Sequence, residues 1–337
     1  MSTTFYVGID IACDDFQVAL GQTGGSQAVS SFANEFEGFR QLARHLKRHC
    51  SEQTTLCLVM EPTGGYELAL VAFAHQQGWQ VALPNPLHVR RWAESRGIRA
   101  KTDRVDAQLL AAFGVERQPV PQAPLPSHVA ELDEMLRRKE DLEKMLRQEQ
   151  NRQHALDRRP GVPAAVTESL DSMIDALTQG LCELEQQIKA HLANHSDLVH
   201  YRQLLLSVPG IGLHTVLYIL VFLYRWQVLT QGEGNAKGLT AYAGLDPAPF
   251  RSGRSVHKRT TISKQGNRQL RRRVVHGAFG GIRGDNPLRQ FYLRLVGRNK
   301  PKRLAQVAAA RKMLVWAWAV FRSQTAFQPD LAVSTHA

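Results

Sequence analysis

FYVGIDIA, residues 5–12, is an apolar run of the kind that forms a buried β-strand, and it opens a chain of 337 residues. The next segment, FQVAL at 16–20, alternates apolar and polar side chains as a second strand does. Residues 21–27, GQTGGSQ, are rich in glycine and predict the turn that follows. The fold therefore opens with a β-hairpin.

Strand and helix signals continue to alternate after this hairpin. Apolar residues recur at helical spacing over 36–49, and 55–60, TLCLVM, is a short apolar strand. A second helix is expected over 66–78, and a strand over 80–86 is stopped by prolines. Residues 1–125 are therefore predicted to form an α/β domain.

The pattern changes between residues 126 and 200 to two long polar helices, separated by the helix-breaking residues 158–164, RRPGVPA. Apolar residues recur in steps of three and four, which predicts an antiparallel hairpin or coiled coil. A bundle within one chain and a seam between two chains give the same pattern, and of the two we favour dimerisation.

Residues 201–325 are predicted to form a mainly helical third domain, followed by a tail over 326–337. It begins with a helix, the turn PGIG at 209–212 and an apolar helix, an arrangement typical of a helix-hairpin-helix. Gly210 and Gly212 would let a DNA phosphate approach the amides at the start of the second helix. A tight turn between packed helices explains the same residues equally well. A basic loop, a helix at 267–278 and a closing helix at 303–321 follow.

Composition favours a globular protein, since 43% of the residues are hydrophobic and 21% are charged. We expect a cytoplasmic protein, because neither a signal peptide nor a span of about 20 apolar residues is evident, and we expect no membrane partner. The four cysteines are scattered without a CxxC pair, so they predict reduced thiols and not a disulfide framework or a zinc site.

Positive charge is concentrated in one region of the chain. Residues 251–312 hold 18 Lys and Arg and one acid, Asp285, so they carry +17 while the rest of the chain carries −5. A basic block that also contains apolar helical segments predicts a folded surface for a polyanion, and we favour nucleic acid over a merely solvated basic face.

Four carboxylates form a second constellation. Asp10 lies inside the first strand, where a buried charge needs a positive partner, and Glu61 stands where the strand 55–60 ends. Asp103 and Asp106 share one face at the start of a predicted helix, although acids there also serve as ordinary caps. If the four meet, divalent cations would neutralise them, and Mg²⁺ or Mn²⁺ suits oxygen ligands best.

These motifs resemble the DEDD insertion-sequence transposases of insertion sequence family 110 and its 1111 subgroup, a group that includes the Piv-type DNA invertases. The resemblance rests on GIDIA at 8–12, MEPTGGYE at 60–67 and KTDRVDA at 101–107. It continues through SVPGIG at 207–212, AYAGLDP at 241–247, SGRS at 252–255 and ISKQGNRQLRR at 262–272. Each piece is short, but their order and spacing over nearly the whole chain are specific.

The resemblance implies a RuvC-like domain with a ribonuclease H fold, in which Asp10, Glu61, Asp103 and Asp106 are catalytic and bind the metal. It implies that Ser252 is a nucleophile that forms a covalent phosphoserine link to DNA, with Ser255 and Ser263 as nearby alternatives. From the residues alone, Ser252 would be an ordinary loop hydroxyl or phosphate contact. The resemblance also implies a bridge RNA that pairs with donor and target DNA, and a homo-oligomer, a dimer or tetramer, in which the acids of one subunit work with the serine of another.

The predicted nucleic-acid contacts are Gly210, Gly212, Arg251, Arg254, Lys258, Arg259, Lys264, Arg268, Arg271 and Arg272. The same surface is expected to include Arg273, Arg298, Lys300, Lys302 and Arg303.

Three other functions remain open at this point. A kinase of the sugar-kinase and actin superfamily shares a similar first strand, but no second phosphate loop is evident. A hydrolytic RuvC-like junction-resolving nuclease would use the acids alone and leave Ser252 idle. A non-catalytic architectural DNA-binding protein would need neither the acids nor a metal.

Overall fold

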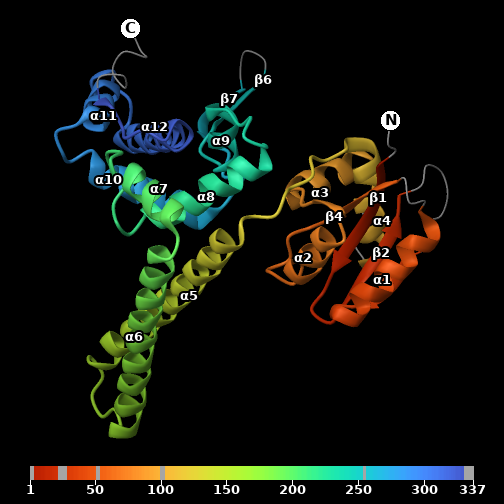
Figure 1. Cartoon of the computed structure of the whole chain (residues 1–337). Helices are drawn as coiled ribbons and strands as arrows, with labels where there is room; N and C mark the ends of the chain where they lie inside the picture. The colour runs from red at the N-terminus through yellow and green to blue at the C-terminus, as the bar shows by residue number, and fades with distance from the viewer. Residues whose placement is uncertain (1–3, 22–28, 51–53, 99–102, 253–255, 330–337) are drawn as a thin grey trace. The chain divides into compact units, whose positions relative to one another are not determined.

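The computed structural model describes residues 4–21, 29–50, 54–98, 103–252 and 256–329, of which 103–104, 250–252 and 256–259 are described by their backbone alone. The chain divides into two compact units, Met1–Pro124 and Leu125–Ala337. The N-terminal unit is coloured red to gold in Figure 1.

A mixed five-stranded sheet forms the centre of the N-terminal unit. Its order is β3-β2-β1-β4-β5, with β1 at Thr4–Ile11, β2 at Asp15–Leu20, β3 at Val29–Ala33, β4 at Thr55–Met60 and β5 at Gln80–Ala82. β1, β2 and β3 pair antiparallel, whereas β4 pairs parallel with both β1 and β5. The carboxyl ends of β1 and β4 therefore lie at the same edge of the sheet.

Helices pack on both faces of this sheet. One face buries Val7, Ile9, Leu58 and Met60 in a core with helices α1 (Phe36–His49) and α2 (Leu68–Gln76). The opposite face buries Cys57 and Val59 with α3 (Pro86–Ser95) and α4 (Asp103–Arg117). Because both faces are covered, the central strands are apolar on both sides, as the α/β prediction requires.

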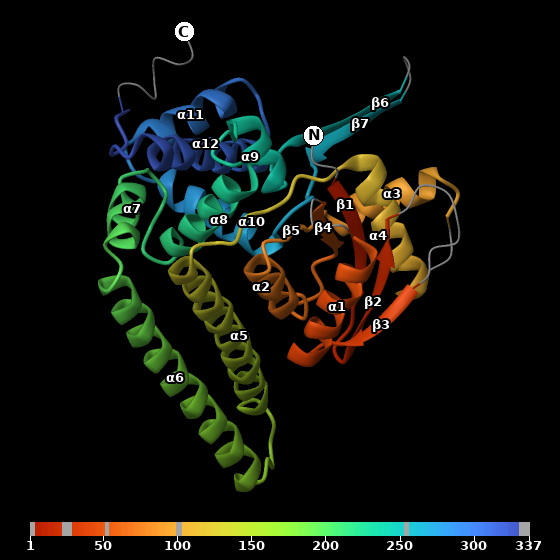
Figure 2. The same cartoon turned by 45° about the vertical axis from the view of Figure 1, so that its right-hand side comes forward.

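Two helices of 30 residues each open the C-terminal unit, α5 at Ser127–Leu156 and α6 at Ala164–Ala193. They lie side by side as an antiparallel hairpin (Figures 1 and 2). At the base of the hairpin, Asp197 accepts hydrogen bonds from the hydroxyl of Tyr224 (2.9 Å) and pairs with Nε2 of His128 (2.8 Å). The predicted pair of long helices is confirmed, and dimerisation through them remains a prediction.

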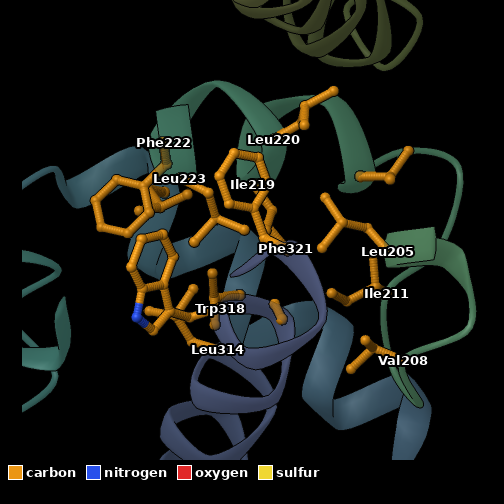
Figure 3. Close-up of a cluster of buried hydrophobic side chains, with 14 of the residues drawn as sticks. Leu205, Val208, Ile211, Ile219, Leu220, Phe222, Leu223, Leu314, Trp318 and Phe321 are labelled. Atoms are coloured by element: carbon orange, nitrogen blue, oxygen red, sulfur yellow. The ribbon is translucent and has the colours of Figure 1, made fainter. Parts of the chain in front are cut away.

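The remaining described elements of this unit are six helices and one hairpin: α7 (Ser196–Leu206), α8 (Val216–Leu229), α9 (Ala236–Tyr242), the hairpin of β6 (Pro247–Ser252) and β7 (Val256–Ile262), α10 (Arg268–Gly281), α11 (Pro287–Gly297) and α12 (Lys302–Ser323). Figure 3 shows Leu314, Trp318 and Phe321 packed against the apolar side of α8. α12 is the one helix of the described residues with the length and apolar composition to cross a membrane, and 56% of its most apolar window is buried inside the structure.

The structure contains elements that the periodicity of the sequence did not indicate. β3, α3, α9 and α11 were not predicted, and the segment expected to be a basic loop after residue 241 contains the strands β6 and β7. These two strands pair with each other alone, with a register irregularity between Ala248 and Phe250. A two-stranded ribbon of this kind buries little, so it lacks the apolar alternation that marks a strand. The four cysteines are not joined by disulfides in the structure, and Cys57 alone of them is buried.

Gly210 is the point where the turn between α7 and α8 meets α10. Its φ is +94°, and a Cβ there would lie 2.7 Å from the Met313 sulfur and 3.0 Å from the Gly277 carbonyl oxygen. Gly281 lies against the same residue, since a Cβ on Gly281 would be 2.7 Å from the Gly210 Cα. The close approach of these backbones explains the glycines at all three positions.

Gly210→Ala is therefore expected to lower the free energy of unfolding by about 2 to 5 kcal/mol, because it combines a left-handed backbone with overpacking. Gly212→Ala is the matched control, since a Cβ there would meet nothing within 4 Å, and its effect should stay within about 0.5 kcal/mol. Urea unfolding and amide exchange of the full chain measure both. Peptides of α10 and α12 should exchange faster in Gly210→Ala, and β1 and β4 should not change. Equal effects of the two variants would contradict this packing role.

Candidate functional site

Asp10 and Glu61 lie at the ends of adjacent parallel strands. The last paired residues of β1 and β4 are Ile9 and Met60, so Asp10 and Glu61 are the next residues in the same register. Side chains alternate along a strand, and Ile9 and Met60 enter the core with α1 and α2. Asp10 and Glu61 are therefore on the other face, toward α4, and both are partly exposed.

Helix α4 places the remaining two acids at the same edge. A Cβ on Gly8 would lie 2.1 Å from the Ala107 carbonyl oxygen, and one on Gly114 would lie 2.9 Å from the Tyr6 side chain. α4 thus crosses β1 antiparallel to it and in close contact, which only glycine at position 8 permits. Its first residues, Asp103 and Asp106, therefore lie toward the end of β1 where Asp10 is found.

The start of α4 favours negative charge at this edge of the sheet. The N-terminus of α4 carries the positive end of the helix dipole, and Asp103 and Asp106 are in its first turn. Asp10, Glu61 and Asp106 each take part in a polar or electrostatic interaction in the protein. Among the side chains that the structure describes, which exclude that of Asp103, no group of three His, Cys, Asp or Glu has a geometry that could hold a metal ion.

The loop after Glu61 is held by a carboxylate that sequence reasoning missed. Glu67 is only 6% exposed, and its Oε2 accepts hydrogen bonds from the amides of Thr63 and Gly65, each at 3.0 Å. The Thr63 hydroxyl donates to the carbonyl oxygen of Glu61 (3.1 Å). A buried charge that accepts two amides stabilises one loop conformation. The signal in the sequence was the second acid of MEPTGGYE.

Asn34 connects this loop to the turn that follows Asp10. Its side-chain amide nitrogen donates to the carbonyl oxygens of Ala12 (3.0 Å) and Tyr66 (3.2 Å). Its backbone amide donates to the carbonyl of Asp14 (2.9 Å). The segments that carry Asp10 and Glu61 are therefore tied together by one side chain from the end of β3, which no local pattern indicated.

Ser252 is the last residue of β6, paired in register with Val256 of β7, and its side chain lies outside the described residues. The alternative, Ser263, has its hydroxyl bonded to the Asp246 carboxylate and its amide bonded to the Asp246 carbonyl. Ser263 thus closes the base of the β6–β7 hairpin. Ser255 is outside the described residues.

The predicted basic contacts divide into two groups. Arg271 donates to the carbonyl oxygens of Gly266 (2.7 Å) and Ala243 (3.4 Å), and burial lowers the pKa of its guanidinium. Arg273 lies 3.5 Å from the centre of the Tyr218 ring and donates to Glu140 of α5 at 2.8 Å. Both therefore have structural contacts within the C-terminal unit, whereas Lys264, Arg268 and Arg272 are exposed.

The remaining predicted nucleic-acid contacts are four basic residues near the β6–β7 hairpin and the glycines Gly210 and Gly212. The side chains of Arg251, Lys258 and Arg259 are outside the described residues, as is all of Arg254. Gly210 packs against α10, and the amide of Gly212 donates to the Thr215 hydroxyl (3.2 Å) at the start of α8. The predicted pair of helices is present as α7 and α8. The helix-hairpin-helix motif, and phosphate binding by its turn, remain predictions.

Comparison with known proteins finds similarity along nearly the whole chain. The DEDD transposase model for IS110 matches residues 7–157, and the model of the transposase IS116/IS110/IS902 family matches residues 202–293. The pilin gene-inverting protein of Moraxella lacunata is 33% identical over 97% of this chain and 98% of its own length, and that of Moraxella bovis is 32% identical over the same shares. An uncharacterised protein of insertion element IS110 from Streptomyces coelicolor is 31% identical over 48% of this chain and 40% of its own length.

Proposed function

The chain belongs to the IS110 family of DEDD transposases, which makes it a DNA-processing enzyme, and we propose that it cuts and rejoins DNA through a serine–DNA intermediate. The proposal is supported by the parallel pairing that ends β1 and β4 next to Asp10 and Glu61, and by the close contact of β1 with α4, which begins at Asp103. The mixed strand order supports the ribonuclease H fold that the sequence motifs imply.

Carboxylates are the donors that Mg²⁺ and Mn²⁺ prefer, so the oxygen-only set of these four acids suits such an ion. When bound, the ion would polarise a DNA phosphate and stabilise charge on the attacking and leaving oxygens. Asp10 would hold it from β1, Glu61 from the residue that follows β4, and Asp103 and Asp106 from the start of α4. Glu67 and Asn34 would keep the two flanking segments in place.

Ser252 would supply the nucleophile. Its oxygen would attack the DNA phosphorus while the bond from phosphorus to the leaving nucleotide oxygen breaks. A carboxylate would take the proton of the serine hydroxyl and pass it to that leaving oxygen. The hydroxyl of a new strand then attacks the phosphoserine and releases Ser252. The number of phosphoester bonds is conserved, so rejoining needs no ATP. Ser263 is less suited to this role, because its hydroxyl is bonded to Asp246.

The basic region would bind nucleic acid without reading sequence. Lys264, Arg268 and Arg272 are exposed cations, and phosphate contacts of this kind position a backbone. We propose that a bridge RNA supplies sequence choice by pairing with donor and target DNA, and that the protein acts as a homo-oligomer, a dimer or tetramer. The pilin gene-inverting relatives indicate inversion as one possible product of the same chemistry.

A suicide substrate tests the proposal. Protein, RNA transcribed from the DNA flanking its gene, Mg²⁺ and labelled, nicked donor DNA are incubated, and the protein is then denatured. We expect label on the denatured protein with Mg²⁺ and none with EDTA. Cleaved DNA without bound label would indicate a hydrolytic nuclease instead. DNA binding with no cleavage under any metal would indicate an architectural DNA-binding protein.

A further inference from the structure

Tyr66 is an exposed aromatic residue on a firmly held loop. Its side chain is 51% exposed, and it lies between Glu61 and the start of α2. Its amide donates to the Thr63 carbonyl (3.3 Å), and its carbonyl accepts from Asn34 (3.2 Å). Glu67 holds the amides of Thr63 and Gly65, and the Gly65 carbonyl accepts from the amide of Leu68 (3.1 Å). The ring of Tyr66 is therefore exposed to solvent, while hydrogen bonds fix the backbone of its loop.

The ring also spans the two segments that carry acids. The Tyr66 hydroxyl is hydrogen-bonded to Cys13, three residues after Asp10, while its backbone is five residues after Glu61. The hydrogen bond with Cys13 raises the pKa of the Tyr66 phenol, and the nearby charge of Asp14 acts in the same direction. A neutral phenol beside these acids adds no repulsion toward a DNA phosphate.

A lone exposed aromatic is ordinary on a protein surface, and Phe36, at 59% exposed, is an example. Phe36 differs because its ring packs edge-on against Phe73 and beneath Arg40, so it covers its own core. The Tyr66 side chain is 51% exposed and its hydroxyl is bonded to Cys13, so part of the ring is accessible to solvent. An aromatic face held rigidly is the element that stacks on unpaired bases.

We infer that Tyr66 is a stacking platform for an unpaired nucleobase next to the phosphate held by the acidic site. The inference rests on the proposed function, since it takes DNA as the substrate. Opening of base pairs at the cut site would expose such a base, and stacking on Tyr66 would hold its nucleotide in place. Tyr66 is thus a substrate-positioning residue, which binds the DNA beside the reacting phosphate.

The test measures binding without cleavage. Full-length Asp10→Asn protein and the flanking RNA are mixed with element-end DNAs that each carry 2-aminopurine at one position, and fluorescence is followed. We expect quenching at one position, retained in Tyr66→Phe and Tyr66→Trp and lost in Tyr66→Leu, with DNA binding weakened about 5- to 150-fold in Tyr66→Leu. Cys13→Ala breaks the hydrogen bond and keeps the ring, so quenching should persist.

Two results would overturn the inference: quenching that is unchanged in Tyr66→Leu, or quenching that Tyr66→Phe and Cys13→Ala remove as completely as Tyr66→Leu. The second would mean that the hydroxyl contact, and not the ring, matters. A separate measurement tests the proposed function. If that function is wrong, the protein with Asp10 intact will show no Mg²⁺-dependent cleavage of DNA.

Discussion

Ser252→Ala should abolish the covalent protein–DNA product and lower the recombined product by on the order of 10³-fold or more, since it removes the atom that bonds to phosphorus. Ser252 ends strand β6. Alanine is tolerated in such a strand, so the fold should be retained. The measurement is label retained on denatured protein from the suicide substrate, together with circular dichroism. Ser252→Cys keeps a nucleophile and should retain a trace of label.

The neighbouring serines are the matched controls for this variant. Ser255→Ala should keep full label, and Ser263→Ala should keep label while losing some stability, because the Ser263 hydroxyl is bonded to Asp246. If label is retained in Ser252→Ala and lost in Ser255→Ala, the nucleophile is Ser255 and not Ser252. Cleavage that persists in all three variants without any label would support the hydrolytic reading.

Asp10→Asn should reduce cleavage by a similar factor, on the order of 10³-fold or more, while the protein remains folded. Asparagine has the shape of aspartate but lacks the charge, so the fold at the end of β1 should persist while affinity for Mg²⁺ falls. The variant also reduces repulsion among the acids in the absence of metal. We therefore expect a melting temperature in EDTA at or above that of the parent chain, and a smaller rise on adding Mn²⁺.

Asp14→Asn is the control for the charge change. Asp14 is exposed in the turn four residues after Asp10, and it does not belong to the four acids. Its substitution should leave cleavage within a few-fold of the parent and preserve the Mn²⁺ effect on melting. Equal loss of cleavage in the two variants would show that the region needs overall negative charge and not a ligand at position 10.

The structure changes the interpretation of the arginine run at 271–273. Sequence analysis placed all three on a surface for nucleic acid, because positive charge is concentrated in residues 251–312. Arg273 instead packs over Tyr218 and pairs with Glu140, while Arg271 donates to two backbone carbonyls. Arg272 is exposed, so of the three it is the one best placed to contact a phosphate.

Local patterns in the sequence were enough to identify β1, β2, β4, α4, the long helices α5 and α6, and the four acids. Apolar alternation and helical periodicity are properties of neighbouring residues, so they can be recognised in a short stretch of sequence before the fold is known. The family motifs predict catalytic and metal-binding roles for the four acids, and these roles remain predictions. These patterns did not indicate β3, the β6–β7 hairpin or the short helices α3, α9 and α11. The three helices have 10, 7 and 11 residues, so each offers only two or three turns over which a period can be recognised.

Tertiary structure alone decided which residues meet. The parallel pairing of β1 with β4 puts Asp10 and Glu61 in register on one face, and the contact of Gly8 with Ala107 brings the start of α4 to the same edge. The ties made by Asn34 and Glu67, and the packing of Gly210, likewise join segments or select one loop conformation. Strand register and close backbone contacts depend on residues far apart in the chain, so no window of sequence contains them.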